Sequence, residues 1–292
     1  NITYSKNGNL SSRNQVLFSD EKFSISGLKK YITNSEFSYI KDLLRTSDLK
    51  KKLLLFDISS KKKLVIIPVK SNLKTSEIES LGAEFYNKVN YGKNSEYVIN
   101  AESIDNKNKN FLVYFLHGLK LKSYEFKKYK TKKESRTISL TVVGKKNIPS
   151  QKDQIKFKAL EEGTFYARDL VSEPGNILHP DEYAKRINTL RKHGLKVNVY
   201  DEKKLKKLGM HALLGVGQGS IRGSYLVTME WNGLKNNSKP LAFVGKGVCF
   251  DTGGYSLKPA RFMEDMTYDM AGSATVVGLM KNFALRKAKI NA

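Results

Sequence analysis

The residues with the clearest chemical potential lie between positions 244 and 270. Lys246 stands between two glycines after an apolar run, Asp251 precedes a Thr-Gly-Gly turn, Lys258 lies in the following loop, and Asp269 precedes an apolar helical stripe. Carboxylates with no histidine nearby suit divalent cations such as Mn²⁺, Mg²⁺ or Zn²⁺. A lysine among them can be a neutral amine ligand or a cation that polarises a carbonyl. The spacing leaves a second interpretation equally open, in which Lys246 pairs with Asp251 and Asp269 caps a helix.

The spacing of Lys246 and Asp251 also raises a geometric difficulty. They are five positions apart, so on a regular strand their side chains point to opposite faces. A bend at Gly247, or the end of the strand, must bring them together. Cys249, between them, lies in an apolar run and is expected to be a small core residue. As the only cysteine it excludes an internal disulfide and a cysteine-based zinc cage, and a reducing compartment fits best.

The elements that must position these residues read as alternating strands and helices. Such alternation predicts parallel βαβ packing, with a site outside the carboxyl ends of the strands. The glycine-rich run Gly215–Ser220 matches neither nucleotide-binding spacing, so a tight turn is expected there. The predicted strands are Leu195–Tyr200, Tyr225–Trp231 and Leu241–Val244, with a short apolar run at Val248–Phe250, and the predicted helices are Gln154–Asp169, Asp181–His193 (stopped by Gly194) and Asp201–Leu208.

The first half also indicates a mixed α/β fold, and the Pro/Ser/Lys-rich stretch Lys145–Lys152 is a candidate linker. The fold class is therefore α/β, with an N-terminal α/β domain at 1–150 and a second domain at 151–292. In the first domain, strands are predicted at Gln15–Phe18, Lys52–Ile58, Lys63–Val69, Tyr97–Asn100 and Thr137–Val143, an amphipathic helix at Thr75–Asn90 and a buried helix at Asn110–Lys122.

The net charge of +24 is a weak guide to function. The basic residues are mostly lysine, present in both halves, whereas nucleic-acid readers rely on arginine, so a general compositional bias is favoured over a DNA-binding face. The stretch Ser123–Lys133 interleaves lysines with aromatic residues, which can serve single-stranded nucleic acid, but a solvated loop is favoured. No apolar run approaches the ~18 residues of a membrane helix, and nothing resembles a signal peptide.

Several long motifs resemble the leucyl aminopeptidase (cytosol aminopeptidase) family. They are Val244–Pro259 and Met263–Ala274, supported by Ala167–Pro180 and Leu208–Ser220, and the likeness runs in order over roughly residues 158–292. The resemblance implies an N-terminal domain of macro-domain-like α/β fold followed by an α/β catalytic domain of aminopeptidase type.

The resemblance implies a cytoplasmic enzyme that releases N-terminal residues from peptides, with Leu and other apolar residues preferred. It implies two divalent metal ions, Mn²⁺ or Zn²⁺, and a homo-hexamer. Lys246 would be the amine ligand of one metal, Asp251 would bridge both, and Asp269 would be a further ligand of the metal that Lys246 holds. Lys258 would stabilise the oxyanion, and Met266 would form a wall of the pocket for the substrate side chain. All five would thus bind substrate.

The chain departs from the family pattern in one main respect. The family's Asn-Thr-Asp-Ala-Glu-Gly-Arg run, which supplies two more metal ligands and an arginine, does not occur in residues 1–292. We therefore expect a piece cut at both ends, incomplete in its catalytic domain and inactive by itself. Asp265 is a possible extra ligand, but the motif assigns that role to Asp269. The alternatives are a basic nucleic-acid-binding accessory protein of the same family and a degenerate structural homologue.

Overall fold

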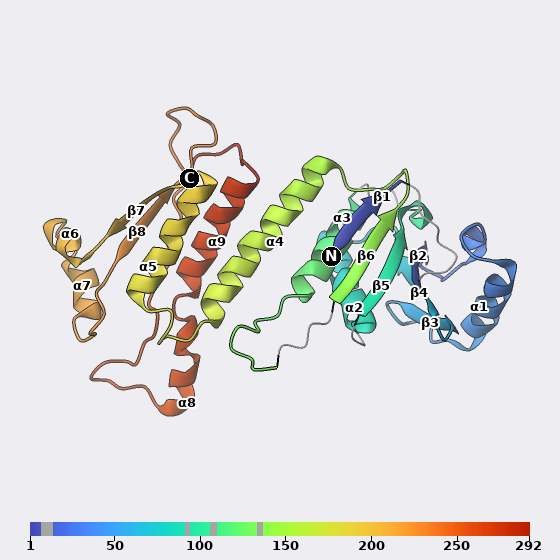
Figure 1. Ribbon diagram of the computed structural model, residues 1–292, viewed down its shortest axis with the longest axis horizontal. Helices are drawn as coiled ribbons and strands as arrows, with labels where there is room; N and C mark the ends of the chain where they lie inside the picture. The colour runs from blue at the N-terminus through green and yellow to red at the C-terminus, as the bar shows by residue number, and fades with distance from the viewer. Residues whose placement is uncertain (7–13, 91–93, 106–109, 133–136) are drawn as a thin grey trace. The chain divides into compact units, whose positions relative to one another are not determined.

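The computed structural model describes residues 1–6, 14–90, 94–105, 110–132 and 137–292 (Figure 1). Its contacts divide the chain into two compact units, Asn1–Gln154 and Ile155–Ala292. Both units combine helices with strands, and the parallel-dominated sheet of the first confirms the predicted α/β class. No helix among the described residues combines the length and apolar character that crossing a membrane requires.

The first unit is built on one six-stranded sheet in the order β1-β6-β5-β2-β4-β3. Every neighbouring pair is parallel except β3 and β4, which form an antiparallel pair at one edge. The strands are β1 (Ile2–Ser5), β2 (Asn14–Asp20), β3 (Leu54–Ser59), β4 (Lys62–Val69), β5 (Asn94–Asn100) and β6 (Thr137–Val143), and the helices are η1 (Ser26–Leu28), α1 (Asn34–Thr46), α2 (Thr75–Val89), η2 (Ala101–Ser103) and α3 (Phe111–Lys122).

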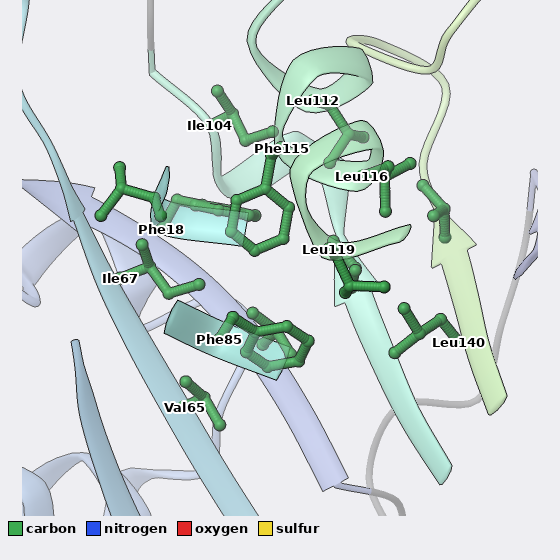
Figure 2. Close-up of a cluster of buried hydrophobic side chains, with 14 of the residues drawn as sticks. Phe18, Val65, Ile67, Phe85, Ile104, Leu112, Phe115, Leu116, Leu119 and Leu140 are labelled. Carbon is green, nitrogen blue, oxygen red and sulfur yellow. The ribbon is translucent and has the colours of Figure 1, made fainter. Parts of the chain in front are cut away.

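Alternation along the central strands assigns each side chain to one of two cores. In β2, Val16 and Phe18 lie in the cluster that α2 and α3 cover, whereas Leu17 lies in the cluster that α1 covers. Side chains of a strand alternate between its faces, so a sheet covered on both sides has strands that are apolar throughout. Figure 2 shows Phe18, Phe85 and Phe115 meeting in the first of these cores. The rings of Phe18 and Phe115 meet edge to face at 5.6 Å between centroids.

Helices α2 and α3 approach each other at two glycines. A Cβ at Gly82 would lie 1.9 Å from the carbonyl oxygen of Phe115, and a Cβ at Gly118 would lie 2.0 Å from that of Glu79. Both distances are far below van der Waals contact, so neither position has room for a side chain. The predicted amphipathic and buried helices are confirmed as α2 and α3, and these glycines set how closely they pack.

The second unit contains a two-stranded sheet and a set of helices around one core. Its elements are α4 (Gln151–Ser172, which begins in the first unit), α5 (Pro180–Asn188), η3 (Thr189–His193), β7 (Lys196–Tyr200), α6 (Glu202–Lys207), α7 (His211–Gly217), β8 (Leu226–Glu230), α8 (Ala260–Met263), η4 (Glu264–Tyr268) and α9 (Ala271–Leu285). Gly194 ends η3 with φ +90°, as the sequence predicts. Gly215 and Gly217 lie at the end of α7, and the expected tight turn follows directly, with the N–H of Ser220 donating to the carbonyl of Gly217 at 3.0 Å.

Strands β7 and β8 pair antiparallel, so the prediction of parallel βαβ packing is wrong here. The connection between them passes through α6 and α7 at one end of the pair and returns from that end (Figure 1). A parallel pair would need a crossover to the opposite end. The short helices α6 and α7 therefore behave as a long turn.

The predicted strand Leu241–Val244 is also wrong. Residues 241–250 have no regular secondary structure, and the side chain of Val244 is 97% exposed. Apolar character alone indicated a strand here. Among the N–H groups described in this segment, however, only that of Leu241 donates to another backbone carbonyl, that of Asn291. Lys246 and Asp251 therefore both lie in irregular backbone and not on a strand.

Helix α9 is the central helix of the second core. Ala274, Val277, Met280 and Phe283 are all buried, which confirms most of the predicted apolar stripe, although Val276 is only partly buried. Helix α4 packs on α9 where Gly278 faces it, since a Cβ at Gly278 would lie 2.5 Å from the carbonyl oxygen of Gly163. The segment before α9, η4, is followed directly by Asp269.

Candidate functional site

The four charged residues form two ion pairs, Lys246 with Asp269 and Lys258 with Asp251. The Nζ of Lys246 donates to Asp269 Oδ1 at 2.7 Å, and the Nζ of Lys258 lies 3.4 Å from Asp251 Oδ2. The expected pair of Lys246 with Asp251 is therefore not the one that forms. Asp269 does not cap α9 through its side chain either, because the cap position is Met270. Neither part of the purely structural interpretation matches the geometry.

The four residues come from irregular backbone and the start of one helix. Lys246 and Asp251 lie in the segment that precedes α8, and Asp269 joins η4 to α9. The Oδ1 of Asp251 accepts a hydrogen bond from the backbone N–H of Gly253 at 2.9 Å, in a turn where Gly253 has φ +90°. Such a conformation favours glycine, which explains the Thr-Gly-Gly sequence after Asp251.

The electrostatics of the pairs favour fully charged groups. The hydrogen bond to Asp269 raises the pKa of Lys246, so its amine carries a proton in this arrangement. The Gly253 N–H and then Lys258 lower the pKa of Asp251 against the opposing effect of burial. Ligation of a metal by Lys246 would require that proton to leave.

Asp269 gives the test of whether these residues fit a metal ion. Its side chain is 18% exposed, and its Oδ2 is a buried oxygen with no hydrogen-bond partner. A buried acceptor without a donor costs about 1–3 kcal/mol, more when charged, and a bound cation would remove that cost. Among the described residues, no group of three or more His, Cys, Asp and Glu is placed to hold a metal. Two carboxylates and an amine, however, form a donor set that suits a borderline divalent cation, so the residues fit.

Three other residues near the site, Cys249, Asp265 and Met266, take no part in the two ion pairs. Cys249 is 7% exposed within the second core, which confirms the core assignment, and burial raises the pKa of its thiol to about 12. Lys246 pairs with Asp269 and not with Asp265. Met266 is half-buried in η4, and its carbonyl accepts from the N–H of Asp269 at 3.4 Å.

Two residues that sequence reasoning missed contact this site. The backbone N–H of Ser273 donates to the carbonyl of Lys246 at 2.9 Å, and the Oγ of Ser273 lies 2.9 Å from the hydroxyl of Tyr183. Tyr183 stands in α5, 90 residues away along the chain. The only signal in the sequence was the pair of glycines around Lys246 together with Gly272 before Ser273, which indicates two backbones in close contact.

Comparison with known proteins then identifies the second unit. Residues 165–292 match the family described as "Cytosol aminopeptidase family, catalytic domain", and this span includes all five predicted site residues. A "Probable cytosol aminopeptidase" of Chelativorans sp. (strain BNC1) is 52% identical over 180 residues, or 60% of this chain and 36% of that protein. Residues 165–292 therefore match the cytosol aminopeptidase family.

Family relatives extend beyond the matched span. A "Probable cytosol aminopeptidase" of Nitrobacter winogradskyi is 43% identical over 225 residues, which is 75% of this chain and 45% of that protein. The chain thus spans less than half the length of these cytosol aminopeptidase relatives.

Solved structures share the fold at lower identity. A mutant of tomato leucine aminopeptidase has a TM-score of 0.79 with this chain at 19% identity, covering 99% of this chain and 60% of that one. The bottromycin maturation enzyme BotP in complex with Mn has a TM-score of 0.71 at 20% identity, covering 94% of this chain and 56% of that one. These likenesses support the α/β aminopeptidase fold predicted from the family resemblance.

Proposed function

We propose that the protein is a metal-dependent aminopeptidase that releases N-terminal residues from peptides, with Leu and other apolar residues preferred. The observation that carries this proposal is the Lys246–Asp269 pair with its unpartnered Asp269 Oδ2, inside the span that matches the family. Residues 1–150 would be the macro-domain-like N-terminal domain, and residues 151–292 the first part of the catalytic domain.

The side chains of this site have distinct tasks in the proposal. Lys246, Asp251 and Asp269 would hold metal, with Asp251 shared between two ions. When bound, the ions would bind the free α-amine of the peptide and activate a water for attack on its carbonyl. The ammonium of Lys258 would stabilise the negative charge that develops on the carbonyl oxygen, and its ion pair with Asp251 orients it. Met266 would contact the substrate side chain.

The metal, the substrate preference, the assembly and the location are proposed from the comparisons, the donor set and the family resemblance. Mn²⁺ is supported by the likeness to BotP, whose solved structure is a complex with Mn, and Zn²⁺ by the amine-and-carboxylate donor set. A preference for Leu is supported by the name of the tomato leucine aminopeptidase. A homo-hexamer follows only from the family resemblance, and a cytoplasmic location is supported by the names of the cytosol aminopeptidase relatives.

We propose further that residues 1–292 alone do not turn over substrate. Within these residues the resemblance places three metal ligands, with Lys246 and Asp269 on one metal and Asp251 shared by both. The second metal would then have Asp251 as its one ligand in this span, which is too few to hold it, and the proposed reaction needs both metals.

The test compares residues 1–292 with the complete gene product, using leucine p-nitroanilide and Mn²⁺. We expect turnover only from the complete product, and a loss of about 10²–10³ in kcat for Lys258→Ala. Lys207→Ala, which removes an exposed lysine of α6 that is not one of the five site residues, is the matched control and should retain activity. Lack of turnover by the complete product would refute the enzyme, and robust turnover by residues 1–292 would refute the inactivity of the piece.

A second candidate, nucleic-acid binding by the basic first half, is supported by one local feature. Phe126 and Tyr129 form an edge-to-face pair at 5.8 Å, Tyr129 is 51% exposed, and the ammonium of Lys128 lies 5.5 Å from its ring centre. Bases stack on exposed aromatic rings beside lysines. Affinity for single-stranded DNA that falls steeply with added salt, and survives Lys246→Ala, would support this function, whereas affinity that is flat across salt would remove it.

A further inference from the structure

The start of α9 is capped by the backbone of Lys246. The first N–H groups of a helix have no partner within the helix, and the cap residue here, Met270, supplies no side-chain hydrogen bond. The N–H of Ser273 instead donates to the carbonyl oxygen of Lys246 at 2.9 Å. This hydrogen bond joins the irregular segment that carries Lys246 to the helix that follows Asp269.

The glycines on either side of Lys246 make this contact possible. A Cβ at Gly245 would lie 2.5 Å from the Cα of Ser273, and a Cβ at Gly247 would lie 3.3 Å from its Oγ. A Cβ at Gly272 would lie 3.4 Å from the backbone of Lys246, which is ordinary contact. Gly245 is therefore required for the close approach, whereas Gly272 has room for a methyl group.

Tyr183 fixes the other side of Ser273. The Oγ of Ser273 donates its one proton to the carbonyl of Met270 at 2.8 Å, so it accepts from the hydroxyl of Tyr183 at 2.9 Å. Tyr183 is 5% exposed, and burial raises the pKa of its phenol, so the hydroxyl stays a donor. The chain of hydrogen bonds from Tyr183 through Ser273 thus ends on the residue next to Asp269.

We propose that Tyr183 and Ser273 are positioning residues that hold Lys246 and Asp269 in register for the metal ion they would share. The Ser273 N–H fixes the backbone of Lys246, and its hydroxyl, locked by Tyr183, fixes the turn between Asp269 and α9. The resulting distance between Lys246 Nζ and Asp269 Oδ1 is 2.7 Å. This inference rests on the proposed function, because it assigns both side chains to one metal.

The test measures the affinity of the complete gene product for Mn²⁺ by electron paramagnetic resonance titration, well below the unfolding temperature. Tyr183→Phe keeps the buried ring and removes only the hydroxyl, and Ser273→Ala removes its acceptor. Because partners that orient metal ligands typically contribute 10–100-fold in affinity, we expect each variant to bind Mn²⁺ about 10-fold more weakly. The double variant should match Ser273→Ala, since that change already removes the Tyr183–Ser273 hydrogen bond together with the one from Ser273 to Met270.

The matched control is Tyr166→Phe, which removes another tyrosine hydroxyl of the same core. That hydroxyl donates to the carbonyl of Arg186 at 3.2 Å and is separate from Ser273. We expect Tyr166→Phe to lower stability without changing Mn²⁺ affinity. Equal Mn²⁺ affinity in wild type and Tyr183→Phe would overturn the positioning role.

A further pair of readouts separates the two proposals. Hydrogen exchange of the Ser273 and Ala274 N–H groups, which donate to the carbonyls of Lys246 and Met270, should speed up in Tyr183→Phe and stay unchanged in Tyr166→Phe, whether or not metal is present. Unchanged exchange in Tyr183→Phe would overturn the inference. If wild type binds no Mn²⁺, or Lys246→Ala binds it as tightly as wild type, the metal site of the proposed function fails, and the positioning of Lys246 for a metal fails with it.

Discussion

The contact of α4 with α9 gives a quantitative prediction about the scaffold of the site. Replacing Gly278 by Ala places a Cβ 2.5 Å from the carbonyl oxygen of Gly163, and replacing Gly163 places one 2.5 Å from that of Gly278. Both obstacles are backbone atoms within helices, so no side-chain rotation relieves them. The two helices must move apart by several tenths of an ångström along a seam that includes the buried Val277.

Two opposing effects determine how much Gly278→Ala changes the free energy of unfolding. Overpacking a closely packed interior typically costs about 1–3 kcal/mol. Replacing Gly by Ala inside a helix gains about 1 kcal/mol from helix propensity. The matched control is Gly215→Ala in α7, where a Cβ meets nothing within 4 Å, so that variant receives the propensity gain alone. The difference between Gly278→Ala and Gly215→Ala therefore isolates the steric cost, which we expect to be about 1–3 kcal/mol.

The assay is urea unfolding followed by the fluorescence of Trp231. It is the only tryptophan of the chain and packs in the second core, with its Nε1 donating to the carbonyl of Ala288 at 2.8 Å. The signal therefore reports the unit that contains the site. Gly163→Ala combined with Gly278→Ala should cost less than the sum of the two, since both open one gap. If Gly278→Ala is as stable as Gly215→Ala, the two helices do not make the close approach described.

Three other predictions concern both units. Lys62→Met should destabilise the first unit by about 1–3 kcal/mol in urea unfolding, because the partly buried carboxylate of Glu36 loses its ion-pair partner, 2.6 Å away, and keeps the N–H of Thr33 as a donor. Burial raises the pKa of Glu36, but Lys62 and Thr33 together lower that pKa by more, so it lies below its ordinary value. The stability advantage of wild type over Glu36→Gln should therefore be full above the ordinary pKa and vanish as the pH falls through the lowered one. A stability advantage that is unchanged down to about pH 2 would contradict this. Cys249 should react with a thiol reagent at about pH 8 only after unfolding, and fast reaction in the native chain would contradict its burial.

The strands and helices of the first unit were predictable because the apolar residues of each segment follow a recognisable spacing. Both faces of its sheet are covered, so strands such as β4 are apolar at successive positions and stand out from the lysine-rich turns around them. The helical spacing of Ile78, Leu81, Phe85 and Val89 likewise marks one face of α2, and all four are buried. Sheet order was not predicted, since nothing in a strand's own residues names its neighbour.

The second unit shows where that kind of reasoning fails. The run Leu241–Val244 has the composition of a strand, but strand character needs a partner, and the side chain of Val244 is almost fully exposed. Alternation of strands and helices indicated a parallel pair, whereas the chain returns from α6 and α7 at the same end and β7 and β8 pair antiparallel (Figure 1). Composition predicts what a segment can form, and contacts decide which of those it does form.

The assignment of the site residues rests on resemblance and not on spacing. Asp251 is five positions after Lys246 and Asp269 is 23 positions after it, yet the direct hydrogen bond is to Asp269. Local spacing favours the nearer carboxylate, because it ignores the fold of the intervening chain. The family motif assigns Lys246 and Asp269 to one metal, a role that awaits the metal-binding test.

One physical rule connects the glycines of both units with the site. Gly82, Gly163, Gly245 and Gly278 all have φ outside the left-handed region, so backbone conformation does not require glycine at any of them. Each instead brings one backbone within contact of another, where a Cβ would meet main-chain atoms at 1.9–2.5 Å. A sequence displays such a glycine but not the residue opposite it. In the Gly245-Lys246 pair that hidden partner is Ser273, so the glycine before the lysine lets the backbone of Lys246 lie against the start of the helix that follows Asp269.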